Sequence, residues 1–401
     1  MKEKPLFIKL TDTALILFFL CLIFSSPLKM LVSKQQSWSK NENRALAPFP
    51  QFPASPTAAK DYFSFIDQYL NDHFGFREYY IYRYQRELAK RFGQSGPNSK
   101  VITGLDGWYF FNDFNLLEDF QGRTPLSKAM INNWFALQDN KQQWLAKRGI
   151  KYLFLAAPNK QSVYPQFLMK HALAIKKTSR FEQILSFKNH KLPPYMINLH
   201  DLLQPEKFDK PLYYKNDSHW NKYSAYLVFK EIMKKISTWF PEESFKTQFD
   251  FVPDETGAGG NLGLGGDLTR MLMLRDATET FPQIKRFKRC GQYHPLPYPL
   301  SNISTAYGRE SFTRTCDKKN LKALVFRDSF FVQLEPFFSE NFKEIVYLWK
   351  PYDQKNVEEI LHYFKPDVVI ELIVERNIFD SLEPPREQKH ARIDPIHPQT
   401  P

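Results

Sequence analysis

Short apolar runs that alternate with amphipathic helical segments are the feature that most constrains the fold of this chain. The runs occupy residues 150–157, 195–199, 321–326, 344–348 and 366–374. Helical periodicity appears beside them at residues 127–148, 220–240 and 357–364. Strands that are apolar right through are typical of a parallel sheet covered by helices on both faces. We therefore predict an α/β fold of three layers, α/β/α, with a mostly parallel sheet.

The bulk composition narrows the class of protein. With 401 residues the chain is long enough for one large domain or two ordinary ones, and 37 Phe, 20 Tyr and 7 Trp supply ample core material. Its net charge of +12 fits nucleic acid, an anionic membrane surface or an acidic polymer as partner. No RNP motif or zinc-finger spacing accompanies the charge, so we expect no nucleic-acid partner. No metal-ligand spacing occurs either, and we expect no metal and no cofactor.

The N-terminus carries the strongest signal for the cellular compartment. Residues 14–24 are apolar without interruption, which fits the core of a signal peptide as well as a membrane helix. The wider window 10–32 makes about 35 Å of helix, long enough to cross a bilayer, and Lys2, Lys4 and Lys9 lie before it. We predict an uncleaved single-pass anchor with a cytoplasmic tail. A cleaved signal peptide is the alternative, and both place the rest of the chain outside the cytoplasm.

Changes in composition along the chain predict its division into segments. A proline-rich stretch follows the anchor, and residues 61–91 have helical spacing that Gly75 interrupts. Residues 101–111 read as a hairpin that turns at Asp106-Gly107. The predicted segments are a tail and anchor at 1–36, a linker at 37–60, a main domain at 61–385 with an insertion at 250–318, and a loose tail at 386–401.

Cysteine usage agrees with an extracytoplasmic location. Cys21 lies in the apolar N-terminal segment, whereas Cys290 and Cys316 lie in the predicted insertion. In an oxidising compartment these two could close one disulfide across a short loop. Two unrelated thiols are the alternative that the sequence leaves open.

Two short motifs offer the groups of serine acyl-transfer chemistry. Asp217 and His219 lie one residue apart, and Ser329 lies three residues past the predicted strand 321–326. Reactive groups of open α/β sheets gather at the carboxyl ends of strands. Acyl transfer to serine needs a nucleophile, a base and a carboxylate that orients the base. Asp217 and Ser329 would also suit plain helix N-caps, which is the structural alternative.

A set of motifs in one order along nearly the whole chain resembles the alginate O-acetylation proteins of the AlgJ/AlgX type. The motifs are Asn41-Glu42-Asn43-Arg44 with Pro48-Phe49-Pro50, Asp72-His73-Phe74-Gly75-Phe76-Arg77, Gly104-Leu105-Asp106-Gly107-Trp108-Tyr109-Phe110, Ala157-Pro158-Asn159-Lys160 with Tyr164-Pro165, Asp217-Ser218-His219-Trp220, Gly266-Asp267-Leu268 and Asp328-Ser329-Phe330. The resemblance implies an SGNH-hydrolase-like domain. It also implies an extracytoplasmic acetyltransferase or acetylesterase that acts on a polysaccharide.

The resemblance assigns roles and surroundings to this chain. The family's catalytic serine, histidine and aspartate fall on Ser329, His219 and Asp217. The chain ends soon after its last predicted strand, which is similar to the shorter, membrane-anchored relatives that have no carbohydrate-binding module. The implied location is the inner membrane with the bulk of the chain in the periplasm, and the implied acetyl source is a multi-pass membrane partner.

One departure from the family and several secondary residues complete the predicted site. The family's serine usually follows Gly-Asp or Gly-Thr, and Arg327 stands at that glycine position. Arg327 either pairs with an anionic substrate or marks a weakened enzyme. Oxyanion donors are expected from the amide of Ser329, the backbone near Gly265, Gly266 and Asp267, and Asn159. Substrate contacts are expected from Arg376 and Lys160 to acidic sugars and from Tyr164 and Trp220 to sugar rings, with surface charge and core packing as the alternatives.

The sequence thus predicts an O-acetyltransferase that works through an acetyl-serine on an exopolysaccharide or cell-envelope glycan. Two alternatives remain open. One is an acetylesterase with the same residues and water as acceptor. The other is a non-catalytic glycan-binding or scaffold subunit of a polysaccharide export complex, which the Arg327 departure favours.

Overall fold

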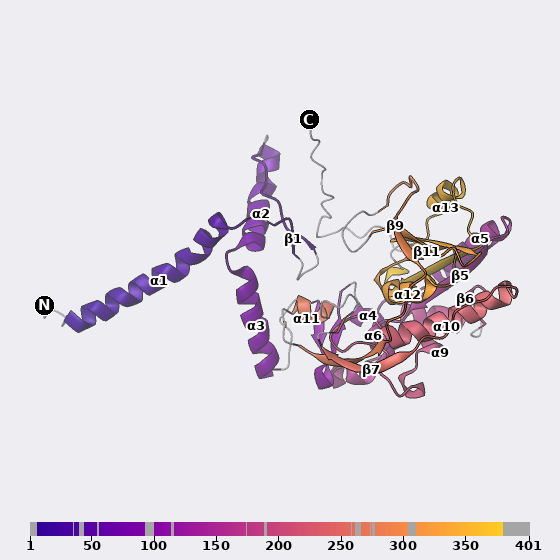
Figure 1. Ribbon diagram of the computed structural model, residues 1–401. Coiled ribbons are helices and arrows are strands. Elements are labelled where there is room, and N and C mark those ends of the chain that lie inside the picture. Colours follow the sequence, from indigo (N-terminus) through magenta and orange to yellow (C-terminus); the bar gives the residue numbers. More distant parts are fainter. Residues whose placement is uncertain are drawn as a thin grey trace. The chain divides into compact units, whose positions relative to one another are not determined.

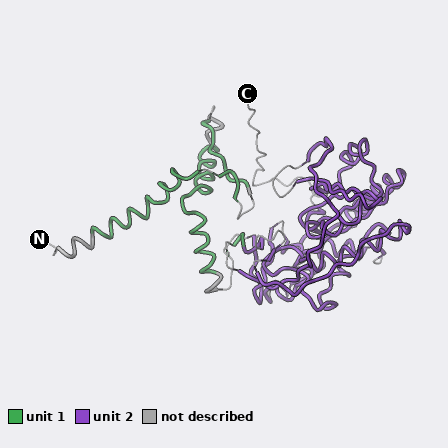
Figure 2. The backbone as a smooth tube through the Cα atoms, in the orientation of Figure 1, with its two compact units in different colours: residues 1–96, 270–274, 389–401 green, residues 97–269, 275–388 purple. Residues whose placement is uncertain are grey.

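The computed structural model divides the chain into two compact units (Figures 1 and 2). Unit 1 comprises residues 1–96, 270–274 and 389–401, and unit 2 comprises 97–269 and 275–388. The structure describes residues 6–34, 36–39, 44–53, 56–92, 100–113, 116–173, 175–187, 191–257, 259–260, 266–272, 274, 277–303 and 310–379. The tail 386–401, residues 41–43 of the first motif and Gly265 lie outside these ranges. The expected domain start at residue 61 falls inside unit 1.

A seven-stranded sheet forms the centre of unit 2, in the order β6-β5-β13-β11-β12-β10-β9. The strands from β6 to β12 pair in parallel, β10 pairs antiparallel with β12, and β9 pairs antiparallel with β10. The predicted mostly parallel sheet is therefore confirmed. The strands are β5 (Lys151–Ala157), β6 (Met196–Ile197), β9 (Gln292–Pro295), β10 (Phe312–Thr315), β11 (Lys322–Arg327), β12 (Glu344–Leu348) and β13 (Val368–Val374).

Helices cover both faces of this sheet, as the uninterrupted apolar strands require. On β5, Leu153 and Leu155 belong to the core of one face, whereas Tyr152 and Phe154 belong to the core of the other. The first core includes residues of α9 (Leu199–Leu202), α10 (Lys222–Trp239) and α12 (Glu335–Phe338). The second includes residues of α5 (Lys128–Ala146), α8 (Arg180–Ser186) and α13 (Gln354–Leu361).

Local signals account for where the two longest helices of unit 2 begin and end. The hydroxyl of Ser127 accepts a hydrogen bond from the amide of Met130 and caps α5, and Gly149, with φ of 74°, follows its end. The side chain of Asn221 accepts from the amides of Tyr223 and Ser224 and caps α10. This cap fixes the chain direction just after His219 and thereby helps to place the imidazole.

Segment 250–318 differs from its expected role as a plain insertion. It contains a hairpin, β7 (Phe251–Gly257) with β8 (Glu279–Ile284), and it also supplies β9, an edge strand of the main sheet, and its neighbour β10. These two strands have only four residues each, and β9 is exposed throughout. Short, polar strands lack the apolar run by which the buried strands were predicted.

Shorter elements join the main layers of unit 2. The predicted hairpin is confirmed, with positive φ at Asp106 and Gly107 in its turn. The hairpin strands are β3 (Val101–Thr103) and β4 (Tyr109–Phe111), and short helices are α4 (Leu116–Phe120), α6 (Lys160–Val163), α7 (Lys170–Leu173) and α11 (Asp267–Met271). Single 3₁₀ turns include Leu105–Gly107, Pro165–Phe167, Pro205–Lys207, Ser329–Gln333 and Glu375–Asn377.

Unit 1 holds an apolar helix and two further helices. The helix α1 (Leu6–Val32) contains Thr13–Val32, which is long and apolar enough to cross a membrane. A two-residue pairing of β1 (Trp38–Ser39) with β2 (Arg44–Ala45) follows. The predicted interruption at Gly75 is confirmed, since it separates α2 (Pro56–His73) from α3 (Arg77–Phe92).

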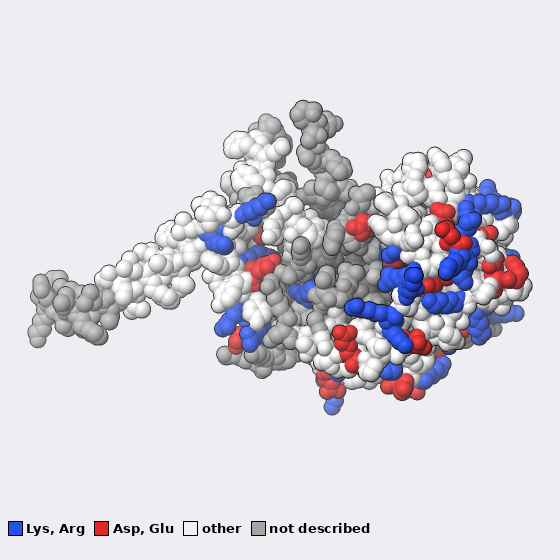
Figure 3. Space-filling view, viewed as in Figure 1, with Lys and Arg blue, Asp and Glu red and all other residues white. Residues whose placement is uncertain are grey.

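Charged side chains of both signs are interspersed over the face of unit 2 shown in Figure 3. Exposed ion pairs such as Lys210 with Asp254, at 2.9 Å, are worth little individually. One stretch concentrates positive charge: Lys285, Arg286, Lys288 and Arg289 are all exposed. We call residues 285–289 the basic segment.

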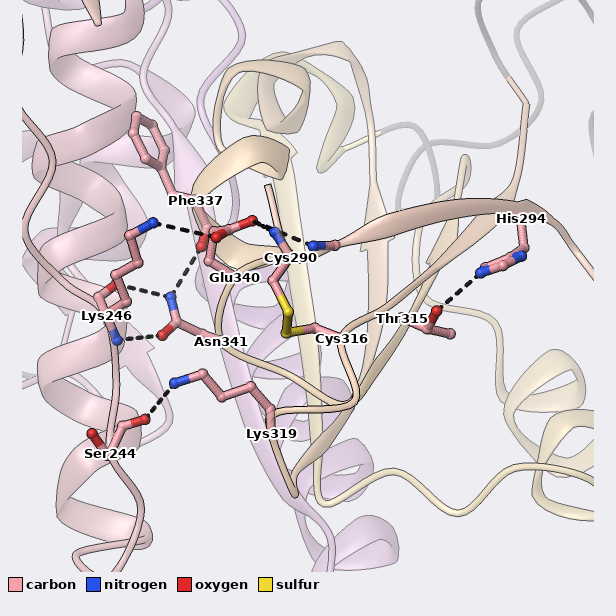
Figure 4. Close-up of a disulfide and its surroundings, with 11 residues drawn as sticks. Ser244, Lys246, Cys290, His294, Thr315, Cys316, Lys319, Phe337, Glu340 and Asn341 are labelled. Atoms are coloured by element: carbon pink, nitrogen blue, oxygen red, sulfur yellow. Dashed lines mark hydrogen bonds and ion pairs between the residues drawn. A yellow bond between two sulfur atoms is a disulfide. The ribbon is translucent and has the colours of Figure 1, made fainter. Parts of the chain in front are cut away.

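A disulfide between Cys290 and Cys316 closes the open end of the β9–β10 hairpin (Figure 4). Cys290 precedes β9 and Cys316 follows β10, 26 residues apart. Glu340 adds a second tie, because its carboxylate accepts from the amide of Cys290 at 2.8 Å and from Lys246 Nζ at 3.3 Å. The edge of the sheet is thus held covalently and by charge-assisted hydrogen bonds.

We expect replacement of both Cys290 and Cys316 by serine to lower the free energy of unfolding by about 3 kcal/mol, because a loop of this length no longer restricts the unfolded chain. Chemical denaturation in detergent measures the loss, and hydrogen exchange should rise in β9 and β10 but not in β5. Cys21→Ser is the matched control and should leave both readouts unchanged. Equal stability of the double variant and the wild type would contradict the expectation.

Candidate active site

Ser329 begins a 3₁₀ turn immediately beyond the carboxyl end of β11. Asp328 holds this turn, because its Oδ1 accepts from the amide of Phe330 at 2.9 Å. Its Oδ2 accepts from the amide of Val374, the last residue of β13, at 2.7 Å. Both carboxylate oxygens of Asp328 are therefore used to fix Ser329 against the neighbouring strand, where parallel α/β sheets place their reactive groups.

Asp217, His219 and Ser329 form one hydrogen-bonded row, although Ser329 lies 110 residues away in sequence. His219 Nε2 lies 2.7 Å from Ser329 Oγ, and His219 Nδ1 lies 2.6 Å from Asp217 Oδ1. Asp217 and His219 are buried, whereas Ser329 is partly exposed. A neutral imidazole that donates to the carboxylate and accepts from the hydroxyl is arranged to take the serine proton.

Acidic neighbours set the electrostatics of His219. Burial by itself lowers the pKa of His219, but the charge and hydrogen bond of Asp217 outweigh burial and raise it above the ordinary value. Asp267 contributes in the same direction, with its Oδ2 3.6 Å from Nδ1. Imidazolium formation, which accompanies proton transfer from serine, is thereby favoured.

Asp267 is tied into the same group from its backbone and its side chain. Its carboxylate accepts from the amide and the hydroxyl of Ser218 at 2.7 and 2.6 Å. Its own amide donates to Asp217 Oδ2 at 3.2 Å. The amide of Asp267, expected to be an oxyanion donor, instead orients the carboxylate of Asp217.

A buried lysine holds the segment that carries Asp217. Lys160 Nζ donates to three backbone carbonyls, those of Tyr109 at 2.6 Å, Lys215 at 2.8 Å and Asp217 at 2.9 Å. Burial lowers the pKa of Lys160, against the opposing pull of the carboxylates of Glu279 and Asp217. The prediction that Lys160 contacts acidic sugars is wrong, because all of its donors point into the protein.

Glu279, in β8, binds the backbone amides of the segment that carries Asp217. Its carboxylate accepts from the amides of Lys215 and, at 3.2 Å, Asn216. Burial raises the pKa of Glu279, and the nearby charge of Lys160 lowers it. A cation on the carbonyls and an anion on the amides thus restrain residues 215–217. We call Lys160 and Glu279 the clamp pair.

Gly266 packs against this segment more closely than any side chain would permit. A Cβ at residue 266 would lie 1.9 Å from the carbonyl oxygen of Asn216. Gly266 was expected near the oxyanion. Its observed contact is with the backbone of the aspartate-bearing segment, and glycine is required there for steric reasons.

Arg376 and Asn159 meet at the carboxyl ends of β13 and β5. Arg376 Nη1 donates to Asn159 Oδ1 at 2.9 Å, and its guanidinium lies over the ring of Phe330. The charge of Arg376 opposes the rise in the pKa of His219. Arg376 is therefore a partly exposed cation beside the serine and histidine, and its contact with acidic sugars stays a prediction.

Glu375 and His200 support this edge and were not predicted. Glu375 is buried and accepts from the amide of Asn159 and the hydroxyl of Ser162, both at 2.8 Å, while His200 Nε2 lies 2.6 Å from its other oxygen. Burial raises the pKa of Glu375, but His200 and these donors outweigh it and lower the pKa. A charged residue directly after a strand end was the available signal for Glu375.

Two other residues with predicted sugar contacts lie in the core. Tyr164 packs against Trp108 with ring centroids 4.4 Å apart, and its hydroxyl accepts from the amide of Leu212. Trp220 is fully buried and donates from Nε1 to the carbonyl of Phe330 at 2.9 Å. Neither ring can stack on a sugar, so both expectations are wrong.

Arg327 likewise points away from a substrate. It is 4% exposed, and its guanidinium lies near the rings of Phe312, Tyr347 and Trp349. Burial lowers its pKa. The aromatic rings accommodate the arginine at the family's glycine position, and the row from Ser329 to Asp217 stays intact.

Asp217, His219 and Asp267 also form a group of potential metal ligands, with all ligand atoms within 4.8 Å of one another. The separation of 2.6 Å between His219 Nδ1 and Asp217 Oδ1 is that of a hydrogen bond with a shared proton. Two ligand atoms at about 2.1 Å from one zinc ion would normally lie further apart. The donor set therefore fits proton transfer better than metal coordination.

Comparisons with known proteins agree with this architecture. Residues 101–293 match the family described as SGNH hydrolase-like domain, acetyltransferase AlgX. This segment includes Asp217 and His219 but ends before Ser329. Over 139 residues the chain is 26% identical to the probable alginate O-acetylase AlgJ of Pseudomonas aeruginosa. That match covers 34% of this chain and 33% of the relative, so it spans about a third of the relative's length.

Three-dimensional comparison matches the chain with solved structures at TM-scores below 0.5. PatB1 of Bacillus cereus is 18% identical with a TM-score of 0.45, over 70% of this chain and 97% of that chain. The O-acetyltransferase domain of AlgJ from Pseudomonas putida is 16% identical with a TM-score of 0.40, over 70% of this chain and 92% of that chain.

We expect the acid limb of the pH–rate profile to depend on Asp217. His219 must be neutral to act as a base, so ester turnover should rise as pH passes its raised pKa. Asp217→Asn removes the carboxylate that raises this pKa, so the limb should move to lower pH while kcat falls about 10³–10⁴-fold. The readout is kcat/KM between pH 4 and 9. Asp254→Asn, at an exposed ion pair, is the control; a limb that stays in place in Asp217→Asn would contradict the assignment.

We expect Lys160→Met to lower kcat strongly while KM for a small soluble ester changes little. The substitution leaves three carbonyls without their donor, each at a cost of about 1–3 kcal/mol, and frees the segment that carries Asp217. Lys141→Met is the matched control, because Lys141 is a partly buried lysine, paired with Glu371 at 2.8 Å. That control should lower the melting temperature without a selective loss of kcat. Equal kcat losses in the two variants would argue against a positioning role for Lys160.

Proposed function

Because this chain carries an SGNH hydrolase-like domain of the AlgJ/AlgX type over residues 101–293, we propose that it transfers acetyl groups to hydroxyls of an extracytoplasmic glycan. The observation that carries the proposal is the continuous hydrogen-bonded row from Ser329 through His219 to Asp217. A buried carboxylate, a base of raised pKa and a partly exposed hydroxyl are the parts that acyl transfer requires.

The proposed reaction has two half-reactions. In the first, Ser329 Oγ attacks the acetyl carbonyl, its proton passes to His219 Nε2, and the leaving oxygen of the donor takes that proton. The acetyl group is then an ester of Ser329. In the second, a glycan hydroxyl attacks this ester, His219 takes the hydroxyl proton, and Ser329 recovers it as the product leaves. Asp217 stabilises the imidazolium in both halves.

The carbonyl oxygen becomes an oxyanion in each half-reaction and needs donors. The guanidinium of Arg376 can only donate hydrogen bonds, so the atom of the Asn159 side chain that faces it is the acceptor Oδ1. The side-chain nitrogen Nδ2 of Asn159 therefore points away from Arg376. We assign Asn159 and Arg376 as oxyanion donors, together with the amide of Ser329. One such donor contributes about 3–4 kcal/mol to the transition state. The buried carboxylate of Glu375 supports Asn159 and Arg376, because it accepts a hydrogen bond from the backbone amide of Asn159.

A basic cavity of about 670 Å³ favours an acidic glycan as acceptor. Four cations line this cavity: Lys222 in the first turn of α10, and Lys285, Arg286 and Arg289 in the basic segment; Glu255 is its one acidic lining residue. Gln333, at the end of the 3₁₀ turn that begins with Ser329, also lines it. Figure 3 shows basic side chains gathered over the region that Figure 1 labels α12 and β7. Carboxylate groups of a polymer would be attracted there.

The helix Thr13–Val32 fits a single-pass anchor, and the disulfide fits an oxidising compartment. We propose an inner-membrane location with unit 2 in the periplasm. A multi-pass membrane protein that carries acetyl groups across the membrane is the proposed donor. The likeness to a probable alginate O-acetylase of Pseudomonas aeruginosa is consistent with an exopolysaccharide as the acceptor.

We expect the purified protein to hydrolyse p-nitrophenyl acetate, with turnover falling to background in Ser329→Ala. The variant loses only one oxygen, so its melting temperature should match that of the wild type. Ser237→Ala is the control, because the hydroxyl of Ser237 donates to the carbonyl of Met233 within α10 and takes no part in the row. Turnover that survives in Ser329→Ala would overturn the catalytic assignment and favour a non-catalytic scaffold.

Addition of candidate glycans distinguishes transferase from esterase. A transferase should produce acetylated glycan, detected by mass spectrometry, at the expense of free acetate. An esterase should instead release acetate from a pre-acetylated glycan and form no new glycan ester. Acidic and neutral glycans of equal length, tested side by side, show whether the basic cavity selects for charge.

A further inference from the structure

The corner between α2 and α3 packs on the last turns of the apolar helix in unit 1. A Cβ at Gly75 would lie 2.1 Å from the carbonyl oxygen of Ser26 and 2.8 Å from the Cβ of Lys29. Ser26 is only 3% exposed, whereas residues 13–24 of the same helix are all exposed. The corner therefore meets α1 at the C-terminal end of the segment Thr13–Val32.

Exposed aromatic side chains surround this contact. Phe74 and Phe76 flank Gly75, and Tyr79, Tyr80 and Tyr84 follow in α3; all five are exposed. Phe76 has φ of 61°, a left-handed conformation that is costly for a bulky residue. Backbone strain that leaves an aromatic ring in solvent marks a position with a functional role. We call these five residues the aromatic corner.

The helix that leaves the corner combines tyrosines with basic residues. In α3 (Arg77–Phe92) the basic residues outnumber the acidic ones, and Arg83 is exposed between the tyrosines. Figure 2 shows α2 and α3 running across the end of α1, not alongside it. A helix of this composition, lying across the end of a membrane-spanning helix, has the features of an interfacial helix.

We propose that the aromatic corner and α3 lie in the headgroup layer of an anionic membrane, with α1 as the spanning segment. Tyrosine and phenylalanine rings suit the boundary between acyl chains and headgroups, and arginines attract anionic lipid. The position of the corner at the end of Thr13–Val32 places it at that boundary. This surface is separate from the serine site and does not depend on the proposed function.

Depth-dependent fluorescence quenching in lipid nanodiscs tests this placement with the full-length protein. In a Cys21→Ser background with the disulfide intact, an NBD label is attached at Tyr80→Cys. The matched control is Tyr363→Cys, an exposed tyrosine of unit 2. Nitroxide-bearing lipids should quench the label at position 80 at least threefold more than the label at 363. The difference should be larger in phosphatidylglycerol than in phosphatidylcholine nanodiscs.

Two further substitutions test which interactions hold the aromatic corner at the membrane. Gly75→Val should reduce lipid quenching at position 80, because a side chain there separates the corner from Ser26. Arg83→Glu should remove the preference for anionic lipid. Equal lipid quenching at positions 80 and 363 would overturn the proposal. Protection of position 80 from aqueous iodide without lipid quenching would also overturn it, because the corner would then be covered by protein.

Discussion

The restraint of residues 215–217 by the clamp pair is the interaction on which the candidate site depends. The row of hydrogen bonds is useful only if Asp217 stays fixed while His219 gains and loses a proton. Lys160 restrains the segment by donating to backbone carbonyl oxygens, three in all, and Glu279 restrains it by accepting from backbone amides. This restraint acts through the backbone, so Oδ1 of the Asp217 side chain can bond to the imidazole. Preorganisation of this kind lowers the cost of charge separation in the reaction.

The cost of this arrangement is an unusual concentration of buried charge. Asp217, Lys160 and Glu375 are all nearly inaccessible to solvent, and each would be expensive to bury alone. Each is instead surrounded by donors or acceptors of the opposite kind. Such networks contribute little net stability, but removal of one member leaves its partners unsatisfied. The carboxyl edge of the sheet is therefore specified by electrostatics, whereas the layers below it are specified by apolar packing.

The sequence was sufficient to predict the α/β/α layers of the fold and the three residues of the hydrogen-bonded row, because both leave local signals in the sequence. Apolar runs predicted β5, β11, β12 and β13, and the motifs that hold Asp217, His219 and Ser329 lie at predicted strand and helix ends. The short strands β9 and β10 left no such signal. The roles of Glu279 and Lys160 depend on contacts across 63 and 57 residues, which no local pattern encodes. Tyr164 and Trp220 were misassigned because aromatic residues near a site and aromatic residues of the core have the same sequence appearance.

The covalent closure of the β9–β10 hairpin has a consequence for how the chain must mature. Strand β9 is the exposed edge of the main sheet, and an unpaired edge is a template for association with another chain. Before oxidation this edge is held by short strand pairings, by Glu340 and by side-chain contacts such as that of His294 with Thr315. A molecule retained in a reducing compartment would therefore be more prone to edge-to-edge aggregation than one already oxidised. Solubility of the chain is in this way coupled to formation of the Cys290–Cys316 disulfide.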